Sequence, residues 1–130
     1  MDTFDKIEQL TDELHLEDFN NTISGDYIEW DVDGACVGWG LFKDPEVSVC
    51  RSFATKGTVF PSHIHDETEI VTIYSGSATY RSSGVESKMK AGDTKVTLPG
   101  VEHSWYFDEN CWMIGITIPA SKGYPDARHK

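Results

Sequence analysis

From residue 27 onward, apolar and polar residues alternate along the chain in short runs. The first two runs carry Ile28, Trp30 and Val32, and then Val37, Trp39 and Leu41. A period of two is typical of a strand with one buried face. Asp33-Gly34 separates the two runs and is a strong signal for a hairpin turn. The pattern therefore predicts an antiparallel hairpin at the start of this region.

The same kind of run recurs through the rest of the chain. Strands are predicted at roughly 47–53, 58–65, 69–74, 77–81, 85–90, 94–98, 103–107 and 111–118. Breakers rich in Gly, Pro, Ser and Asp separate them. Short strands at this regular spacing predict an all-β sandwich or barrel. No helical segment lies between them, which excludes a parallel α/β sheet.

Residues 3–19 are the one segment with helical periodicity. Phe4, Ile7, Leu10 and Leu14 recur at the spacing of one helix face, so a short N-terminal helix is predicted. The whole chain of 130 residues fits a single domain. We therefore expect one domain over residues 1–130, in which the helix precedes the strands.

Charge and composition exclude several classes of partner. The net charge is −11, from 22 acidic and 11 basic residues, and such a surface repels nucleic-acid phosphates and anionic membranes. The acidic N-terminus does not resemble a secretory signal, and no apolar run reaches the length of about 18 residues that a membrane helix needs. A cytoplasmic protein is expected.

The cysteines are odd in number and form no Cys-x-x-Cys pair, which indicates reduced thiols.

Two of the predicted strands carry histidines at a spacing typical of metal ligands. His63 and His65 are two apart, so their imidazoles project from the same face. Glu69 opens the next strand and His103 opens a later one. Three imidazoles and one carboxylate suit one divalent transition metal, namely Mn, Fe, Co, Ni, Cu or Zn.

Here the chain resembles the cupin superfamily. The first cupin motif is Gly, five residues, His-x-His, three or four residues, Glu, six residues, Gly. This sequence places its counterparts at those intervals, in Gly57, His63, His65, Glu69 and Gly76. In the second motif, Gly92, Gly100 and His103 match. Leu98 replaces the motif's proline, and Phe107 replaces its asparagine.

The resemblance implies a jelly-roll β-barrel over about residues 47–118, with His63, His65, Glu69 and His103 as the metal ligands. Glu67 is the competing carboxylate, because it shares parity with His65. Alternation along the strands predicts an inward orientation for several further side chains. These are Val71, Ile73, Ala78, Tyr80, Val96, Leu98, Trp105, Ile114, Ile116 and Ile118.

Two further side chains are candidates for contact with a substrate. Tyr80 is a candidate proton donor. Arg51 could hold a carboxylate if it points inward together with Phe53, although an outward Arg51 fits the pattern equally well. Together with Val71, Ile73, Trp105 and Ile116, Phe53 completes the predicted pocket.

Cupins include dioxygenases, isomerases, lyases and sensor domains, so the resemblance implies two hypotheses. The first is a metal-dependent enzyme that acts on a small anionic or carbonyl-bearing molecule. The second is a cupin that binds or senses a small ligand or a metal without turnover. Small cupins often pair through N-terminal strands, so a homodimer is also expected.

Overall fold

The computed structural model describes residues 27–120, which form ten β-strands. The strands are β1 (Tyr27–Glu29), β2 (Cys36–Asp44), β3 (Val47–Ala54), β4 (Val59–His63), β5 (Thr68–Ser75), β6 (Ser77–Ser82), β7 (Val85–Lys90), β8 (Thr94–Thr97), β9 (His103–Phe107) and β10 (Cys111–Ile118). The predicted all-β class is confirmed, and strand bounds from β4 onward agree with the predicted ones to within two residues. The predicted helix at 3–19 lies outside the described residues.

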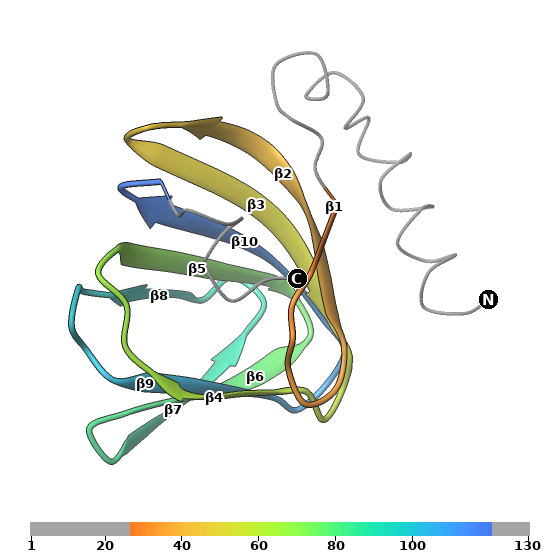
Figure 1. Ribbon diagram of the computed structural model, residues 1–130. Coiled ribbons are helices and arrows are strands. Elements are labelled where there is room, and N and C mark those ends of the chain that lie inside the picture. The colour runs from red at the N-terminus through yellow and green to blue at the C-terminus, as the bar shows by residue number, and fades with distance from the viewer. Residues whose placement is uncertain (1–26, 121–130) are drawn as a thin grey trace.

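The strands form two antiparallel sheets that curve around a common interior (Figure 1). The larger sheet has the order β1-β2-β3-β10-β5-β8, and the smaller has the order β4-β9-β6-β7. Several neighbours are far apart in sequence, as where β10 pairs with both β3 and β5. This arrangement is a β-barrel of the jelly-roll type.

Aromatic and sulfur-containing side chains fill the interior between the sheets. The largest buried group includes Trp30, Tyr80, Trp105, Phe107 and Met113. The Trp30 ring packs over Gly38 of β2, which the register pairs with Ile28. A Cβ at Gly38 would lie 2.8 Å from the Trp30 ring, so only glycine leaves room for it.

The predicted inward orientation of Val96, Leu98 and Ile118 is wrong. Their side chains are 51%, 59% and 46% exposed, respectively. Their neighbours Thr97 and Thr117 are buried instead. The prediction placed the more apolar parity inside, whereas at this end of the barrel the interior is polar and the outer face carries the aliphatic side chains.

Within residues 27–120, no helix is long and apolar enough to cross a membrane.

Candidate metal centre

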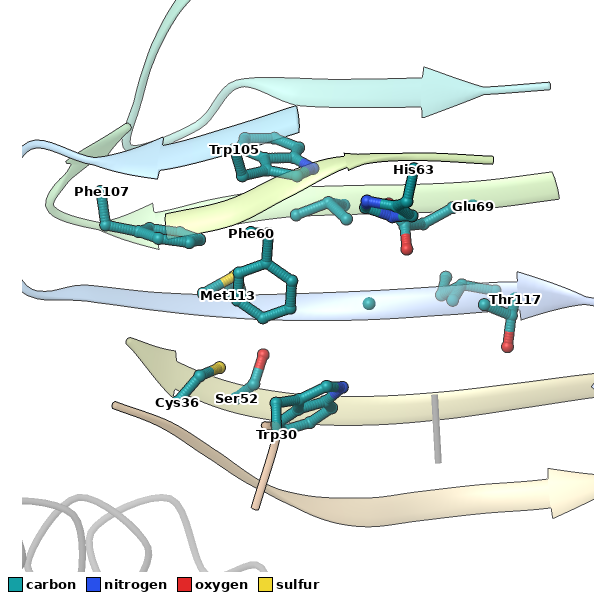
Figure 2. A pocket seen from close by; sticks show the side chains of 13 residues that line it. Trp30, Cys36, Ser52, Phe60, His63, Glu69, Trp105, Phe107, Met113 and Thr117 are labelled. Carbon is teal, nitrogen blue, oxygen red and sulfur yellow. The ribbon is translucent and has the colours of Figure 1, made fainter. Parts of the chain in front are cut away.

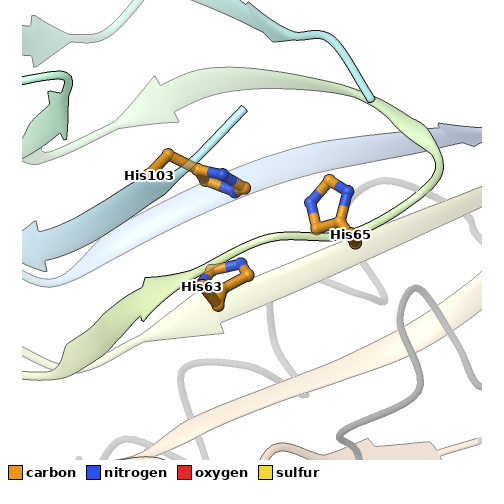
Figure 3. A group of neighbouring side chains, drawn as sticks. All are labelled: His63, His65 and His103. Carbon is orange, nitrogen blue, oxygen red and sulfur yellow. The ribbon is translucent and has the colours of Figure 1, made fainter. Parts of the chain in front are cut away.

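Three histidines, two on neighbouring strands and one in the turn that follows the first, meet at one end of the barrel (Figure 3). His63 ends β4 and His103 begins β9, and the register pairs them directly. His65 follows β4 in the turn toward β5. One ring nitrogen from each histidine can be chosen so that the three atoms lie within 4.8 Å of one another. The spacing of two residues and a hairpin partner thus bring together the three imidazoles that the sequence singles out.

Backbone carbonyls hold the Nδ1 atom of each ring. His63 Nδ1 lies 2.7 Å from the carbonyl of Pro61, and His103 Nδ1 lies 3.0 Å from that of Val101. His65 Nδ1 lies 3.0 Å from the carbonyl of Glu67. A carbonyl only accepts, so each Nδ1 carries the proton and donates it. In each neutral ring the lone pair is then on Nε2, which is the usual arrangement in metal-binding histidines.

Glu69 lies between two of these rings. Its carboxylate oxygens are 3.6 Å from Nε2 of His65 and 3.6 Å from Nε2 of His103. Burial of Glu69 opposes its ionisation, but the His103 and His65 rings stabilise the carboxylate and hold its pKa at about 2. The same contact with Glu69 raises the pKa of His65, against the effect of burial.

The donor set fits a divalent metal ion. Nε2 of His65 and Nε2 of His103 are buried and make no hydrogen bond. Buried polar atoms without partners are rare in native proteins, and an ion is one of the groups that satisfies them. Three Nε2 atoms, whose rings carry their proton on Nδ1, and one ionised carboxylate could hold such an ion. These donor types suit a transition metal.

Glu67, the alternative carboxylate, lies on the other side of the His65 ring. Its carboxylate is 3.9 Å from Nδ1, the nitrogen that already donates to the Glu67 carbonyl. The geometry therefore favours Glu69 over Glu67 as the fourth ligand.

Comparison with known proteins agrees with this arrangement. A family model described as Cupin domain matches residues 52–114, which include all four candidate ligands. Residues 52–114 of this chain are a cupin domain. A search of curated proteins finds no matching sequence.

Solved structures share the fold of this cupin at low sequence identity. An RmlC-like cupin from Shewanella frigidimarina has a TM-score of 0.68 at 21% identity, covering 74% of this chain and 86% of that one. KdgF from a Halomonas species has a TM-score of 0.65 at 19% identity, covering 72% and 87%. A predicted oxalate decarboxylase from Thermotoga maritima has a TM-score of 0.62 at 22% identity, covering 68% and 84%.

Buried hydroxyl groups flank Glu69 on the two neighbouring strands of this cupin. The register places Thr97 and Thr117 on either side of Glu69, and Ser48 beside Thr117. Ser48 and Thr117 are hydrogen-bonded to one another. The sequence pattern does not single out these residues, because their place beside Glu69 depends on the register between β5 and its two neighbouring strands.

Tyr80 lies beside the histidines, with its ring stacked at 5.9 Å from that of His103. Its hydroxyl is hydrogen-bonded to Thr97 Oγ1 at 2.7 Å and is buried. Tyr80 does not line the cavity that extends inward from His63 and Glu69. The structure therefore places this candidate proton donor against His103, a candidate metal ligand, and outside the cavity.

A small cavity of about 50 Å³ leads inward from His63 and Glu69 (Figure 2). Of the predicted pocket residues, Val71, Trp105 and Ile116 line it, whereas Ile73 is buried in the core outside it. The remaining lining residues are Trp30, Cys36, Ser52, Phe60, Phe107, Met113, Gly115 and Thr117. Most of this wall comes from strands far apart in sequence, which explains why alternation along the strands missed it.

Arg51 and Phe53 lie on the opposite face of β3 from the cavity. The Arg51 guanidinium stacks at 4.7 Å over the ring of Trp112 and at 5.3 Å over that of Trp39. Phe53 packs edge-on against Trp112 at 5.0 Å. Ser52, the residue between them, lines the cavity instead. Of the two orientations that the sequence left open for Arg51, the structure shows the outward one, and Phe53 accompanies it.

Proposed function

We propose that this cupin is a metal-dependent enzyme, of the dioxygenase, lyase or isomerase type, that acts on a small anionic or carbonyl-bearing molecule. The observation that carries the proposal is the position of the cavity. His63 and Glu69 belong both to the ligand set and to the cavity wall. A divalent ion held by His63, His65, Glu69 and His103 supplies a Lewis acid for a substrate oxygen.

The protein's own residues prepare the site in two ways. The carbonyls of Pro61, Glu67 and Val101 fix the imidazole tautomers, so the lone pairs stay on Nε2. Phe60 and Trp105 lie on the wall beyond the ligands and make it apolar (Figure 2). Apolar surroundings strengthen electrostatic interactions between a substrate and the charged groups around it.

Few side chains in this site are placed to transfer a proton to or from a substrate. Tyr80 donates to or accepts from Thr97 and is outside the cavity, and Arg51 faces away. This favours chemistry centred on the metal over a dedicated acid–base pair. It also favours the second candidate function, in which the site binds a small ligand without converting it.

One solved neighbour, the protein from Thermotoga maritima, is described as a predicted oxalate decarboxylase, and an enzyme of that kind is consistent with the proposal. KdgF and the predicted oxalate decarboxylase share the fold, although neither is similar enough in sequence to transfer a reaction.

Turnover by metal-loaded protein tests the proposal. The protein is loaded with Fe²⁺, Mn²⁺ or Ni²⁺ and incubated with carboxylates and β-diketones, while oxygen uptake and product masses are followed. We expect conversion by the wild type and none by His103→Ala, which loses a candidate ligand. Compounds that bind to the loaded protein and are recovered unchanged with every metal would contradict the enzyme and support the binding function.

A further inference from the structure

The cavity beyond the histidines has an apolar wall. Aromatic rings and aliphatic or thioether groups make up most of it, including Trp30, Phe60, Phe107 and Met113. Among the described residues that line it, none is Lys or Arg. Its polar side chains are Ser52, Thr117 and Cys36, together with the candidate ligands.

Two cations of the barrel strands are placed away from this cavity. Arg51 is held between Trp39 and Trp112 on the outer face of the larger sheet. The Lys95 ammonium lies 4.9 Å over the Tyr80 ring and 3.4 Å from Ser87 Oγ. Neither residue belongs to the cavity wall, so the described part of the chain offers no positive side chain to an anionic group deep inside.

The charge of the ligand set limits what the site can accept. Three neutral imidazoles and the Glu69 carboxylate leave a divalent ion with one net positive charge. A singly charged head group at the histidine end balances that charge. A second negative charge at the far end would face Phe107 and Met113, where an unpaired ion is costly to bury.

The volume of the cavity limits the size of the ligand beyond its charged head group. A buried water needs about 10–15 Å³ by a comparable measure, so the cavity of about 50 Å³ has room for about four water-sized groups. A short aliphatic chain fits this space, and the apolar wall favours it.

We propose that the site selects small monoanions, with a chelating carboxylate or enolate head and a short apolar tail, over dianions of the same length. The inference deepens the proposed function and depends on its metal site. Met113, Phe107 and Phe60 then contact the tail, while the head lies beside His63 and Glu69.

A matched pair of ligands tests this selectivity. Ni²⁺-loaded protein is titrated calorimetrically with 2-oxopentanoate and with 2-oxoglutarate, which share a chelating head and a carbon-chain length. They differ at the far end, where one has a methyl group and the other a carboxylate. We expect 2-oxopentanoate to bind at least about tenfold more tightly, because the second carboxylate has no partner in the apolar wall.

Two lysine variants show whether the wall is responsible. Phe60→Lys introduces a cation into the cavity wall, and Val59→Lys introduces the same charge at the preceding position, which lies outside that wall. We expect Phe60→Lys to shift the affinity ratio toward 2-oxoglutarate by at least about tenfold, whereas Val59→Lys leaves it within about twofold. The wild-type ligand pair remains a sufficient test if Phe60→Lys does not fold.

Each result has a distinct meaning. Equal affinity, tighter binding of 2-oxoglutarate, or no binding of either acid by the Ni²⁺-loaded wild type overturns the inference while leaving the metal site standing. An equal shift in both lysine variants also overturns it, because general electrostatics would then explain the preference. Failure of the wild type to bind Ni²⁺ refutes the proposed metal site and the inference with it.

Discussion

Replacing Glu69 by glutamine in the metal-free protein tests the electrostatics of the site. The Glu69 carboxylate is 3.6 Å from Nε2 of His65 and of His103, and its side chain is only 13% exposed. Its pKa falls from an ordinary 4.5 to about 2. At about 1.4 kcal/mol per pKa unit, the ionised carboxylate stabilises the fold by about 3 kcal/mol, to within a factor of two.

The pH range of this stabilisation follows from the two partners. The folded-state pKa of Glu69 is depressed, so its contribution is complete above 4.5 and is lost as the pH falls through about 2. The folded-state pKa of His65 is raised above 6.5, so its contribution is complete below 6.5 and is lost as the pH rises through the folded-state value. Both conditions hold between 4.5 and 6.5.

Urea unfolding of chelator-treated wild type and Glu69→Gln across this range measures the difference. We expect the wild type to be more stable by about 3 kcal/mol near pH 5.5. The difference should vanish toward pH 2 and shrink as the pH rises above 6.5 and through the raised pKa of His65. A difference that is constant across the whole range would refute the reasoning, because it would show that packing rather than charge separates the two proteins.

Three further predictions concern the barrel and its assembly. Phe107→Ala empties a fully buried position, so we expect a loss of about 3–5 kcal/mol in urea unfolding at neutral pH, and a loss below about 1 kcal/mol would contradict the assigned core. Gly76 has a φ of +92°, and an added Cβ would lie 2.1 Å from the Asn110 carbonyl oxygen. Gly76→Ala should therefore lower the melting temperature well below that of Gly115→Ala, where the added Cβ meets nothing within 4 Å, and equal melting temperatures would contradict this. Sedimentation at micromolar concentration should give about 29 kDa if the expected two-fold dimer forms, since one chain has 14.6 kDa, and a mass near that of one chain would exclude it.

The sequence predicts the strands and the histidine cluster well because both depend on short-range patterns. Turn residues mark the strand ends, as at Gly76 and Gly84, where the backbone has a positive φ. The pairing of His63 with His103 needs a long-range register, which the two cupin motifs supply through the resemblance.

The orientation of the side chains around the ligands is harder to predict from the sequence than the strands are. Hydrophobicity places Val96, Leu98 and Ile118 inside, but Thr97 and Thr117 occupy the interior beside Glu69. In most strands the apolar residues mark the buried face. A barrel with a polar site at one end and aliphatic side chains on its outer face reverses this correspondence. Only the parity relative to a known inward residue would have corrected it.

The cavity wall also depends on contacts that no local pattern encodes. Trp30 lies just after β1, and Met113 lies on β10, yet both line the same cavity (Figure 2). Arg51 points outward because β3 packs it between Trp39 and Trp112, two rings from strands on either side. The sequence shows the cation and the aromatic residues but not that they meet.

Metal content is the most direct test of the central claim that the Nε2 atoms of His63, His65 and His103, together with Glu69, hold one divalent ion. Purified protein is stripped, reloaded with Ni²⁺ and measured by inductively coupled plasma mass spectrometry. We expect about one ion per chain in the wild type and in His15→Ala, which removes a histidine that belongs to neither cupin motif, and a sharp loss in His65→Ala and His103→Ala. Full occupancy in His103→Ala, or no bound ion in the wild type, would contradict the account.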